Sequence, residues 1–463
     1  MAEQQSFFPL DAETAATVKR YEDFLLGKAG GYFEVDELSN IIDYYLFKGM
    51  TKYCDGVLEL GNKLHPNSNE LKIKSASTCF AKGDIRNALR IIDTMNNDFD
   101  YEKIILKIEL LQKIGRVKEA QMLAKKLFAD ATAEDPDNID LVCLDLANTF
   151  ISQNNYDIAM KWLLKGEQNN PKNIDILLEK AHAFEQSEDY KKAENIYNQI
   201  IDIDAFMPEV WFNLGQLFYF QRDYNKAIEA FNYSIALDEN DMAITIMLAH
   251  SMFQLERFEE AIELYKTYGE ASGDIWQTDI FIAESFEQMD EYEHAIEYFN
   301  KSLEKYPDNY VALLGIGSCL LSQEKYAESI VFIDRALDIQ EDEPEAWGYL
   351  AEALVGMEKI DDALLAYNKS LLLDPNQPDT VFNLACLLFK KGEKKQALEK
   401  FLSLCKEDEP FELIEVYIAA CYFSLRDINN GIAYLRASME LDRRTIIFFL
   451  EIAPEYYKII HLV

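Results

Sequence analysis

A small residue recurs every 34 residues through most of this chain. Nine members keep this spacing without a break: Ala159, Ala193, Ala227, Ala261, Ala295, Ser329, Ala363, Ala397 and Gly431. Cys54, Ala88 and Ala120 continue the series towards the N-terminus, where the spacing becomes 34, 32 and then 39 residues. Self-similarity at such a period is typical of proteins built from one repeated supersecondary unit. The chain is therefore predicted to be an array of such units.

Within each unit, large apolar residues follow at spacings of three and four, which place them on one face of a helix. In residues 208–241 these include Trp211, Leu214 and Phe218. Gly215 precedes Ala227 by twelve residues, and small residues at both positions allow two helices to approach closely. The chain has only 18 Gly and 11 Pro among 463 residues, which leaves few signals for strands and tight hairpins. The pattern predicts two helices in each unit.

Twelve units fit the pattern. Their predicted bounds are 35–68, 69–100, 101–139, 140–173, 174–207, 208–241, 242–275, 276–309, 310–343, 344–377, 378–411 and 412–445. The first three units (35–139) fit less well than the regular units (140–445), and the insertion at 130–138 is predicted to lengthen the second helix of the third unit. Residues 1–34 are predicted to hold a leader and one helix, and 446–463 a capping half-repeat that Pro454 interrupts.

The repeated residues resemble the tetratricopeptide signature, W-x2-L-G-x2-Y followed by A-x3-F and a closing proline. In the unit 344–377 the matching residues are Trp347, Leu350, Ala351, Leu354, Ala363, Tyr367 and Pro375. The resemblance covers about residues 35–445. It implies an all-α, right-handed superhelical solenoid of about twelve helix-turn-helix units with a C-terminal capping helix, and a non-enzymatic function in protein–protein interaction.

Composition restricts the class of partner and the compartment. The chain has 82 acidic and 45 basic residues, a net charge of −37, which disfavours nucleic acid and anionic membrane surfaces. The N-terminus shows no signal peptide, and no apolar run is long enough to span a membrane. The seven cysteines form no C-x-x-C pair and are predicted to be reduced. We expect an acidic, cytoplasmic protein without membrane insertion.

No motif for catalysis, metal binding or cofactor binding is found. The five histidines have no paired-ligand spacing, and the chain lacks the glycine-rich motifs that bind nucleotides. Cys386 is predicted to face the groove, where a reactive thiol is the less favoured interpretation. We therefore expect no enzymatic activity and no cofactor.

The resemblance also implies where a partner would bind. In tetratricopeptide proteins the concave groove is lined by positions 2, 5, 9, 12 and 13 of each unit. Transferred to this chain, those positions give the predicted partner-binding residues Glu209, Phe212, Gln216, Tyr219, Phe220, Ile246, His250, Phe253, Gln277, Ile280, Glu284, Glu287, Phe382, Phe389 and Phe423. The family's dicarboxylate clamp needs Lys, Asn and Arg at these positions, but Lys is nearly absent from them: only Lys113 and Lys390 qualify, and they are far apart. Acidic chaperone tails are therefore rejected as ligands.

The main functional prediction is a scaffold whose groove binds a peptide or partner protein with apolar or aromatic anchors and basic flanks. A competing interpretation is that some of these aromatic residues pack between neighbouring helices. Two alternatives remain open. One is a self-assembling structural protein or accessory subunit of an enzyme complex, with self-association through Ile459, Ile460, Leu462 and Val463. The other is a ligand-sensing regulator.

Overall fold

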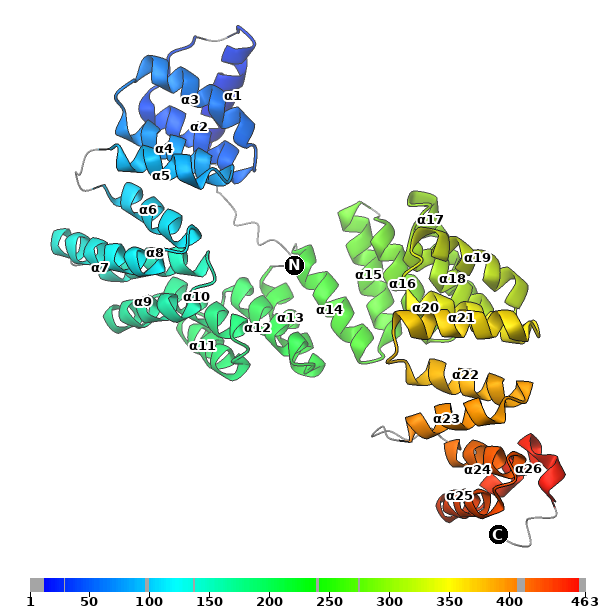
Figure 1. The fold of residues 1–463 in the computed structure, drawn as a ribbon. Coiled ribbons are helices and arrows are strands. Elements are labelled where there is room, and N and C mark those ends of the chain that lie inside the picture. Colours follow the sequence, from blue (N-terminus) through cyan, green and yellow to red (C-terminus); the bar gives the residue numbers. More distant parts are fainter. Residues whose placement is uncertain are drawn as a thin grey trace. The chain divides into compact units, whose positions relative to one another are not determined.

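The computed structural model describes residues 12–28, 30–95, 100–135, 138–238, 241–273, 275–405 and 413–457. Within them, all long elements are α-helices and none is a strand (Figure 1). The predicted all-α fold is confirmed. The helices are α1 Ala12–Leu25, α2 Val35–Phe47, α3 Thr51–Leu64, α4 Asn69–Ala81, α5 Ile85–Asp93, α6 Tyr101–Lys113, α7 Val117–Glu134, α8 Ile139–Ile151, α9 Tyr156–Asn169, α10 Ile174–Gln186, α11 Tyr190–Ile203, α12 Pro208–Phe220, α13 Tyr224–Leu237, α14 Met242–Gln254, α15 Phe258–Ser272, α16 Trp276–Gln288, α17 Tyr292–Lys305, α18 Tyr310–Ser322, α19 Tyr326–Ile339, α20 Pro344–Gly356, α21 Ile360–Leu373, α22 Pro378–Lys391, α23 Lys394–Leu404, α24 Ile414–Ser424, α25 Ile428–Leu441 and α26 Thr445–Ile452.

The chain divides into two compact units, which are described separately. Unit 1 comprises residues 1–217 and unit 2 residues 218–463, so the division falls within α12. In each unit, consecutive helices form packed pairs, as in α8 with α9 or α16 with α17 (Figure 1). We call the helix that opens each pair the first helix and its partner the second helix. From α2 onwards, the even-numbered helices up to α24 are first helices.

The recurring small residues let the two helices of a pair pack closely. Eight of the nine, from Ala159 to Ala397, have no exposed surface, and Gly431 is also buried. In unit 2, a Cβ atom added to Gly317 of α18 would lie 2.6 Å from Cγ1 of Ile333 in α19. Ser329 Oγ of α19 also donates a hydrogen bond of 2.7 Å to the Gly317 carbonyl oxygen. Larger side chains at these positions would force the helices apart.

The turn inside most pairs contains one residue in the left-handed backbone region. From Asn154 onwards this residue recurs every 34 residues, in the turn between the first and the second helix of each pair. At eight of these positions it is not glycine: Asn154, Glu188, Arg222, Glu256, Asp290, Glu324, Glu358 and Arg426. Gly392 occupies the same place in the pair α22–α23. The left-handed conformation reverses the chain within a few residues but is unfavourable for a side chain with a Cβ. Polar caps then start the next helix, as where Asp223 accepts from the backbone N–H of Lys226.

Two irregular features agree with the sequence. The helix α7 has 18 residues where most second helices have 14, so the predicted lengthening at the insertion is confirmed. At the other end, α26 ends at Ile452, two residues before Pro454. Its Phe449 is buried against Phe423 of α24, with ring centroids 5.5 Å apart. The segment Ile459–Val463, proposed for self-association, lies outside the described residues.

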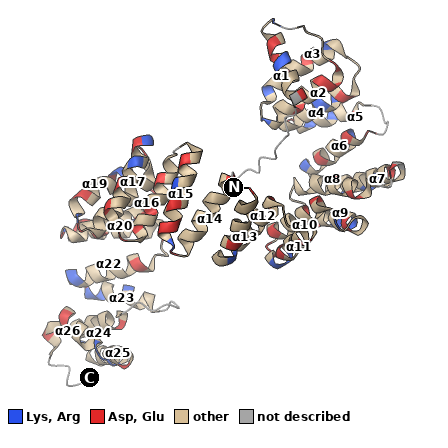
Figure 2. Cartoon of the chain, turned by 180° about the vertical axis from the view of Figure 1, so that it is seen from behind, with Lys and Arg blue, Asp and Glu red and all other residues tan. Residues whose placement is uncertain are grey.

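Acidic residues mark the helices of both units, while several basic residues gather on α22 and α23 (Figure 2). None of the described helices combines the length and apolar character needed to cross a membrane.

Candidate binding face on the first helices

Three first helices of unit 2, together with Phe299 of α17, line an open acidic cavity of about 190 Å³. Glu284 and Glu287 enter it from α16, Tyr310 and Ser318 from α18, and Glu345 and Tyr349 from α20. Residues three or four apart lie on the same face of a helix, as do Glu284 and Glu287 in α16 and Glu345 and Tyr349 in α20. Tyr310 and Ser318 are eight residues, about two turns, apart on one face of α18. Every titratable group in the lining is a carboxyl or a phenol.

Burial controls the protonation of these carboxyl groups. Loss of hydration, with a smaller contribution from Glu287, raises the pKa of Glu284 to about 7. Burial also raises the pKa of Glu287, although hydrogen bonding to Ser318 and Cys319 opposes the shift. Neither carboxylate forms an ion pair with a lysine or arginine in the described part of the chain. When these carboxyl groups ionise, the cavity carries negative charge that no basic side chain of its lining compensates.

Tyrosine side chains complete the cavity. The Tyr349 hydroxyl donates a hydrogen bond of 2.8 Å to Glu345 Oε1, and burial followed by the charge of Glu345 raises the pKa of Tyr349. Burial and the nearby Glu343 and Glu345 raise the pKa of Tyr310 to about 12. Both rings remain neutral phenols near pH 7, so their faces can contact a cation without adding charge.

The half-buried carboxyl group of Glu352 lies about two turns beyond Glu345 along α20. Burial raises the pKa of Glu352, while a hydrogen bond of 3.0 Å donated by Asn383 Nδ2 of α22 partly opposes the shift. Glu284 and Glu352 occupy the same place in their respective 34-residue repeats, the ninth residue of the first helix. Partly buried carboxyl groups are thus a repeated feature of this face in unit 2.

Unit 1 has a comparable but partly neutralised region. First helices α4, α6 and α8 line a cavity of about 560 Å³, in which burial raises the pKa of Glu109 to about 7. The Tyr101 hydroxyl donates to Asp145 Oδ2 at 2.8 Å. Lys74 also lines this cavity, and its ammonium group lies 2.8 Å from Asp43 and 3.8 Å from Glu102. The cation already present makes this cavity a weaker site for a basic ligand.

This chemistry favours binding of a cationic side chain over metal binding. Within the described residues, no three His, Cys, Asp or Glu side chains are grouped closely enough to hold a metal ion. His250 is also unsuited to a charged role, because burial lowers its pKa and its Nδ1 lies 2.8 Å from the Tyr265 hydroxyl.

The predicted residues fall into several environments. In unit 2, Glu284 and Glu287 line the acidic cavity; His250, Phe253, Ile246, Gln277 and Tyr219 are half-buried; and Phe220 is 68% exposed. Phe253 packs on Phe258 and Tyr219 on Tyr224, each at 5.4 Å between ring centroids. Glu209, Phe212 and Gln216 belong to unit 1, where Glu209 is exposed and the other two are half-buried.

Three of the predicted residues are packed in the interior. Ile280, Phe389 and Phe423 are only 5%, 8% and 1% exposed. Phe389 lies beneath the ammonium group of Lys394 and 6.1 Å from the ring of Tyr417. The half-buried Phe382 packs on the same Tyr417 ring, at 5.6 Å. For these residues the structure agrees with packing between neighbouring helices, and we leave all four out of the proposed site.

The sequence prediction also missed Glu345, Tyr310, Ser318 and Tyr349. Glu345 and Glu352 occupy positions 2 and 9 of their unit, so the positional pattern used to choose site residues could have identified both. Tyr310 and Tyr349 occupy positions 1 and 6, outside that pattern. Their participation follows from the packing of α18 between α16 and α20, which a single unit does not reveal.

Comparisons with known proteins agree with this architecture. Family models described as tetratricopeptide repeat match residues 174–206, 208–241 and 288–353. A search of curated proteins found no match to the sequence.

Several solved structures are also similar to this chain. The Cut9–Hcn1 hetero-tetramer of the APC/C matches with 15% identity over 89% of this chain and 97% of that chain, at a TM-score of 0.42. A tetratricopeptide repeat protein from Parabacteroides merdae matches with 16% identity over 53% and 98%, at a TM-score of 0.43. PilF of Pseudomonas aeruginosa matches with 22% identity over 44% and 93%, at a TM-score of 0.40. The paired helices and the three family matches show that this chain contains tetratricopeptide repeats.

Proposed function

We propose that this protein is a non-catalytic scaffold that binds a partner segment through its first helices. The single observation that supports this function is the acidic cavity, where Glu284, Glu287 and Glu345 meet two tyrosine rings without a basic residue of the protein nearby. A lysine or arginine of the partner would supply the missing charge and contact the rings.

Apolar side chains beside that basic residue would bind the partly exposed aromatic residues of unit 2. Phe253 is half-buried and Phe220 largely exposed, so both keep apolar surface that a partner could cover. The preferred segment therefore combines apolar or aromatic anchors with Lys or Arg. Such a segment also complements the chain's net charge of −37, which accelerates association with a cationic partner.

We place this function in the cytoplasm. All seven cysteines are free, and Cys54, Cys143, Cys319 and Cys421 are buried within helix pairs. Buried, unpaired thiols are typical of a reducing compartment.

The test measures binding of a fluorescein-labelled peptide, AKLFRLKA, by fluorescence polarisation at pH 8. Glu284→Gln with Glu287→Gln should weaken binding by about tenfold, because two charge-assisted contacts become neutral ones. The matched control is Glu293→Gln with Glu304→Gln, two exposed residues of α17 that remove the same charge.

Equal affinities in the wild type and the cavity variant would refute the assignment of the site. Equal losses in the cavity and control variants would also refute it, because they would attribute binding to net charge alone. Circular dichroism on each variant establishes that the helices are intact.

A further inference from the structure

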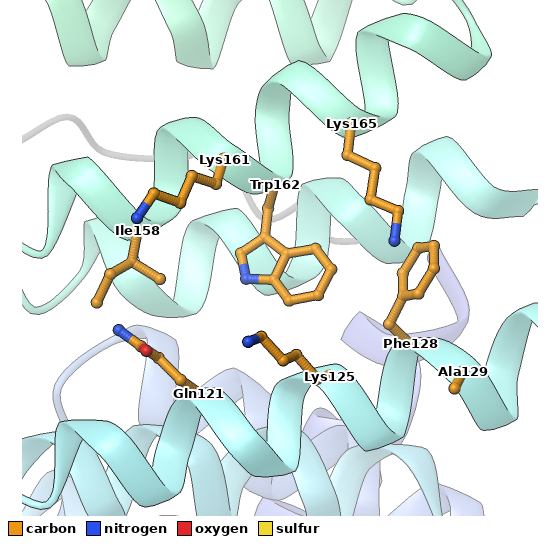
Figure 3. Close-up of a pocket in the computed structure, with 8 residues that line it drawn as sticks. All are labelled: Gln121, Lys125, Phe128, Ala129, Ile158, Lys161, Trp162 and Lys165. Carbon is orange, nitrogen blue, oxygen red and sulfur yellow. The ribbon is translucent and has the colours of Figure 1, made fainter.

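A separate pocket lies between two second helices of unit 1 and shares no lining residue with the two cavities described above. It has a volume of about 530 Å³ and separates α7 from α9. Gln121, Lys125 and Phe128 line it from α7, and Lys161, Trp162 and Lys165 from α9 (Figure 3). Gln121, Lys125 and Phe128 are spaced by four and three residues, which places them on one face of α7. Lys161 and Lys165 are four residues apart and share a face of α9, while Trp162 directly follows Lys161. We call this site the lysine–tryptophan pocket.

The pocket has an apolar floor built from two aromatic rings. The ring centroids of Phe128 and Trp162 are 5.4 Å apart, and Trp162 is largely buried. Figure 3 shows Lys125 on one side of the indole and Lys161 and Lys165 above it. The Lys165 ammonium group lies 3.4 Å from the centroid of Phe128, a cation–π contact that holds this charge over the floor.

Its charge is opposite to that of the chain as a whole. Three lysines and no carboxylate line the pocket, although the chain has a net charge of −37. Among described residues, none of the three lysines forms an ion pair. The other polar groups are the Gln121 amide and the Trp162 indole N–H, and that N–H has no hydrogen-bond acceptor among the described residues. The pocket therefore offers mainly hydrogen-bond donors.

Comparison among the 34-residue repeats shows that two residues of this pocket, Lys161 and Trp162, depart from the repeat pattern. Lys161 lies two residues after the small residue of its second helix. The same position is acidic in four other units, which have Glu229, Glu263, Glu297 and Glu399. Trp162 is also the only tryptophan on a second helix, since Trp211, Trp276 and Trp347 belong to first helices. Both departures from the repeat are in one pocket.

We propose that the lysine–tryptophan pocket binds an acidic segment of a partner protein. Asp or Glu carboxylates of the segment accept from Lys125, Lys161 and Lys165, while one apolar side chain packs on Phe128 and Trp162. This combination follows from charge complementarity and from the apolar floor between the lysines.

A short peptide fits this site better than a nucleic acid or a membrane. Those polyanions extend well beyond three lysines and would meet the acidic surface that dominates the rest of the chain. A peptide with a few carboxylates around one apolar anchor needs only the local positive charge. This proposal does not depend on the acidic cavity, which selects the opposite charge in unit 2.

The test uses a fluorescein-labelled peptide, EDEFLEDE, and its basic counterpart, KKKFLKKK, measured by fluorescence polarisation at 50 mM salt. The acidic peptide should bind the full-length protein, and Lys161→Glu with Lys165→Glu should weaken this binding by at least about tenfold. The matched control is Lys118→Glu with Lys172→Glu, which changes the net charge equally at exposed lysines of unit 1 outside the pocket. Its affinity for EDEFLEDE should stay within about twofold of the wild type.

A second variant tests the apolar floor. Trp162→Leu preserves an apolar side chain in the helix pair but removes the indole, and it should weaken the acidic peptide without changing binding of KKKFLKKK. Thermal unfolding followed by circular dichroism shows whether each variant is folded.

Three results would overturn the proposal. The first is no binding of EDEFLEDE at 1 mM, and the second is an equal loss in the pocket and control variants. The third is lysine-dependent binding of phosphatidylserine vesicles or of a 20-nucleotide single-stranded DNA that exceeds binding of the peptide.

Discussion

Replacing Glu284 with glutamine should stabilise this protein, and the gain should increase with pH. The carboxyl group is buried beside Glu287 in the acidic cavity, and its pKa in the folded protein is about 7. The ordinary value is 4.5, so folding makes the proton harder to remove. Because the folded state binds this proton more tightly than the unfolded state, the ionised form of Glu284 opposes folding.

The size of the effect follows from the two pKa values. Below about pH 4.5 the group is protonated in both states and costs little stability. Between about pH 4.5 and pH 7 the unfolded state ionises first, and stability falls as pH rises; above about pH 7 the cost is constant at about 3 kcal/mol. Glutamine removes this dependence. Its expected gain is therefore about 1 kcal/mol at pH 5 and about 3 kcal/mol at pH 8.

Urea unfolding followed by circular dichroism at pH 5 and pH 8 measures this difference, and urea leaves the electrostatics unscreened. Repeat arrays can unfold in parts, so hydrogen exchange of α16 provides a local measurement. Glu293→Gln on the exposed surface of α17 is the control, and its stability should change by less than about 0.5 kcal/mol at either pH. The reasoning is refuted if the Glu284→Gln gain is the same at pH 5 and pH 8, or if there is no gain.

Three further predictions concern unit 2. Gly315→Ala should destabilise the protein by about 1–3 kcal/mol, because the added Cβ would lie 2.3 Å from Cζ of the buried Phe299. Gly348→Ala should instead stabilise it by about 0.5–1 kcal/mol, because no neighbouring atom lies closer than 3.9 Å to the added Cβ. Urea unfolding of the two variants would contradict this if both shifted in one direction. Ellman's reagent at pH 8 should modify the exposed Cys405 before Cys386, because burial raises the pKa of the Cys386 thiol to about 11; mass spectrometry of partly labelled protein reports the order. The affinity for AKLFRLKA should increase by up to about tenfold from pH 6 to pH 8, because the Glu284 carboxyl group, with a pKa of about 7, ionises over this range. An affinity that does not change with pH would argue against a contact between the peptide and the Glu284 carboxylate.

The fold could be predicted from the sequence because one unit repeats so often. Each copy of the 34-residue pattern contains the same information about which faces pack, so errors in single positions do not alter the result. The two least regular features, the long α7 and the interruption at Pro454, were also predictable, because an insertion and a proline have local effects on a helix.

The candidate site was less predictable because it depends on neighbouring helices. Phe389 and Phe423 occupy positions that line the groove in an average unit, but Tyr417 covers the first and Phe449 the second. Glu284 lies on the first helix α16, as its place in the repeat predicts, but its raised pKa depends on burial, which the repeat pattern alone does not reveal. The lysine–tryptophan pocket was missed because the positional pattern considered first helices only. The sequence signal that could have indicated this pocket is Lys161, which stands where four other repeats have glutamate.

The left-handed residues of the turns have a consequence for engineering. Each of the eight non-glycine residues from Asn154 to Arg426 holds a conformation that glycine adopts without a steric penalty. Glycine already occupies the corresponding turn at Gly392, as it does at Gly49, Gly83 and Gly115 in earlier pairs. The chain therefore offers eight separate sites at which a designer could adjust the stability of one helix pair without touching either proposed binding surface. A graded set of such variants would show how far a partner's affinity depends on the stiffness of the array that presents its site.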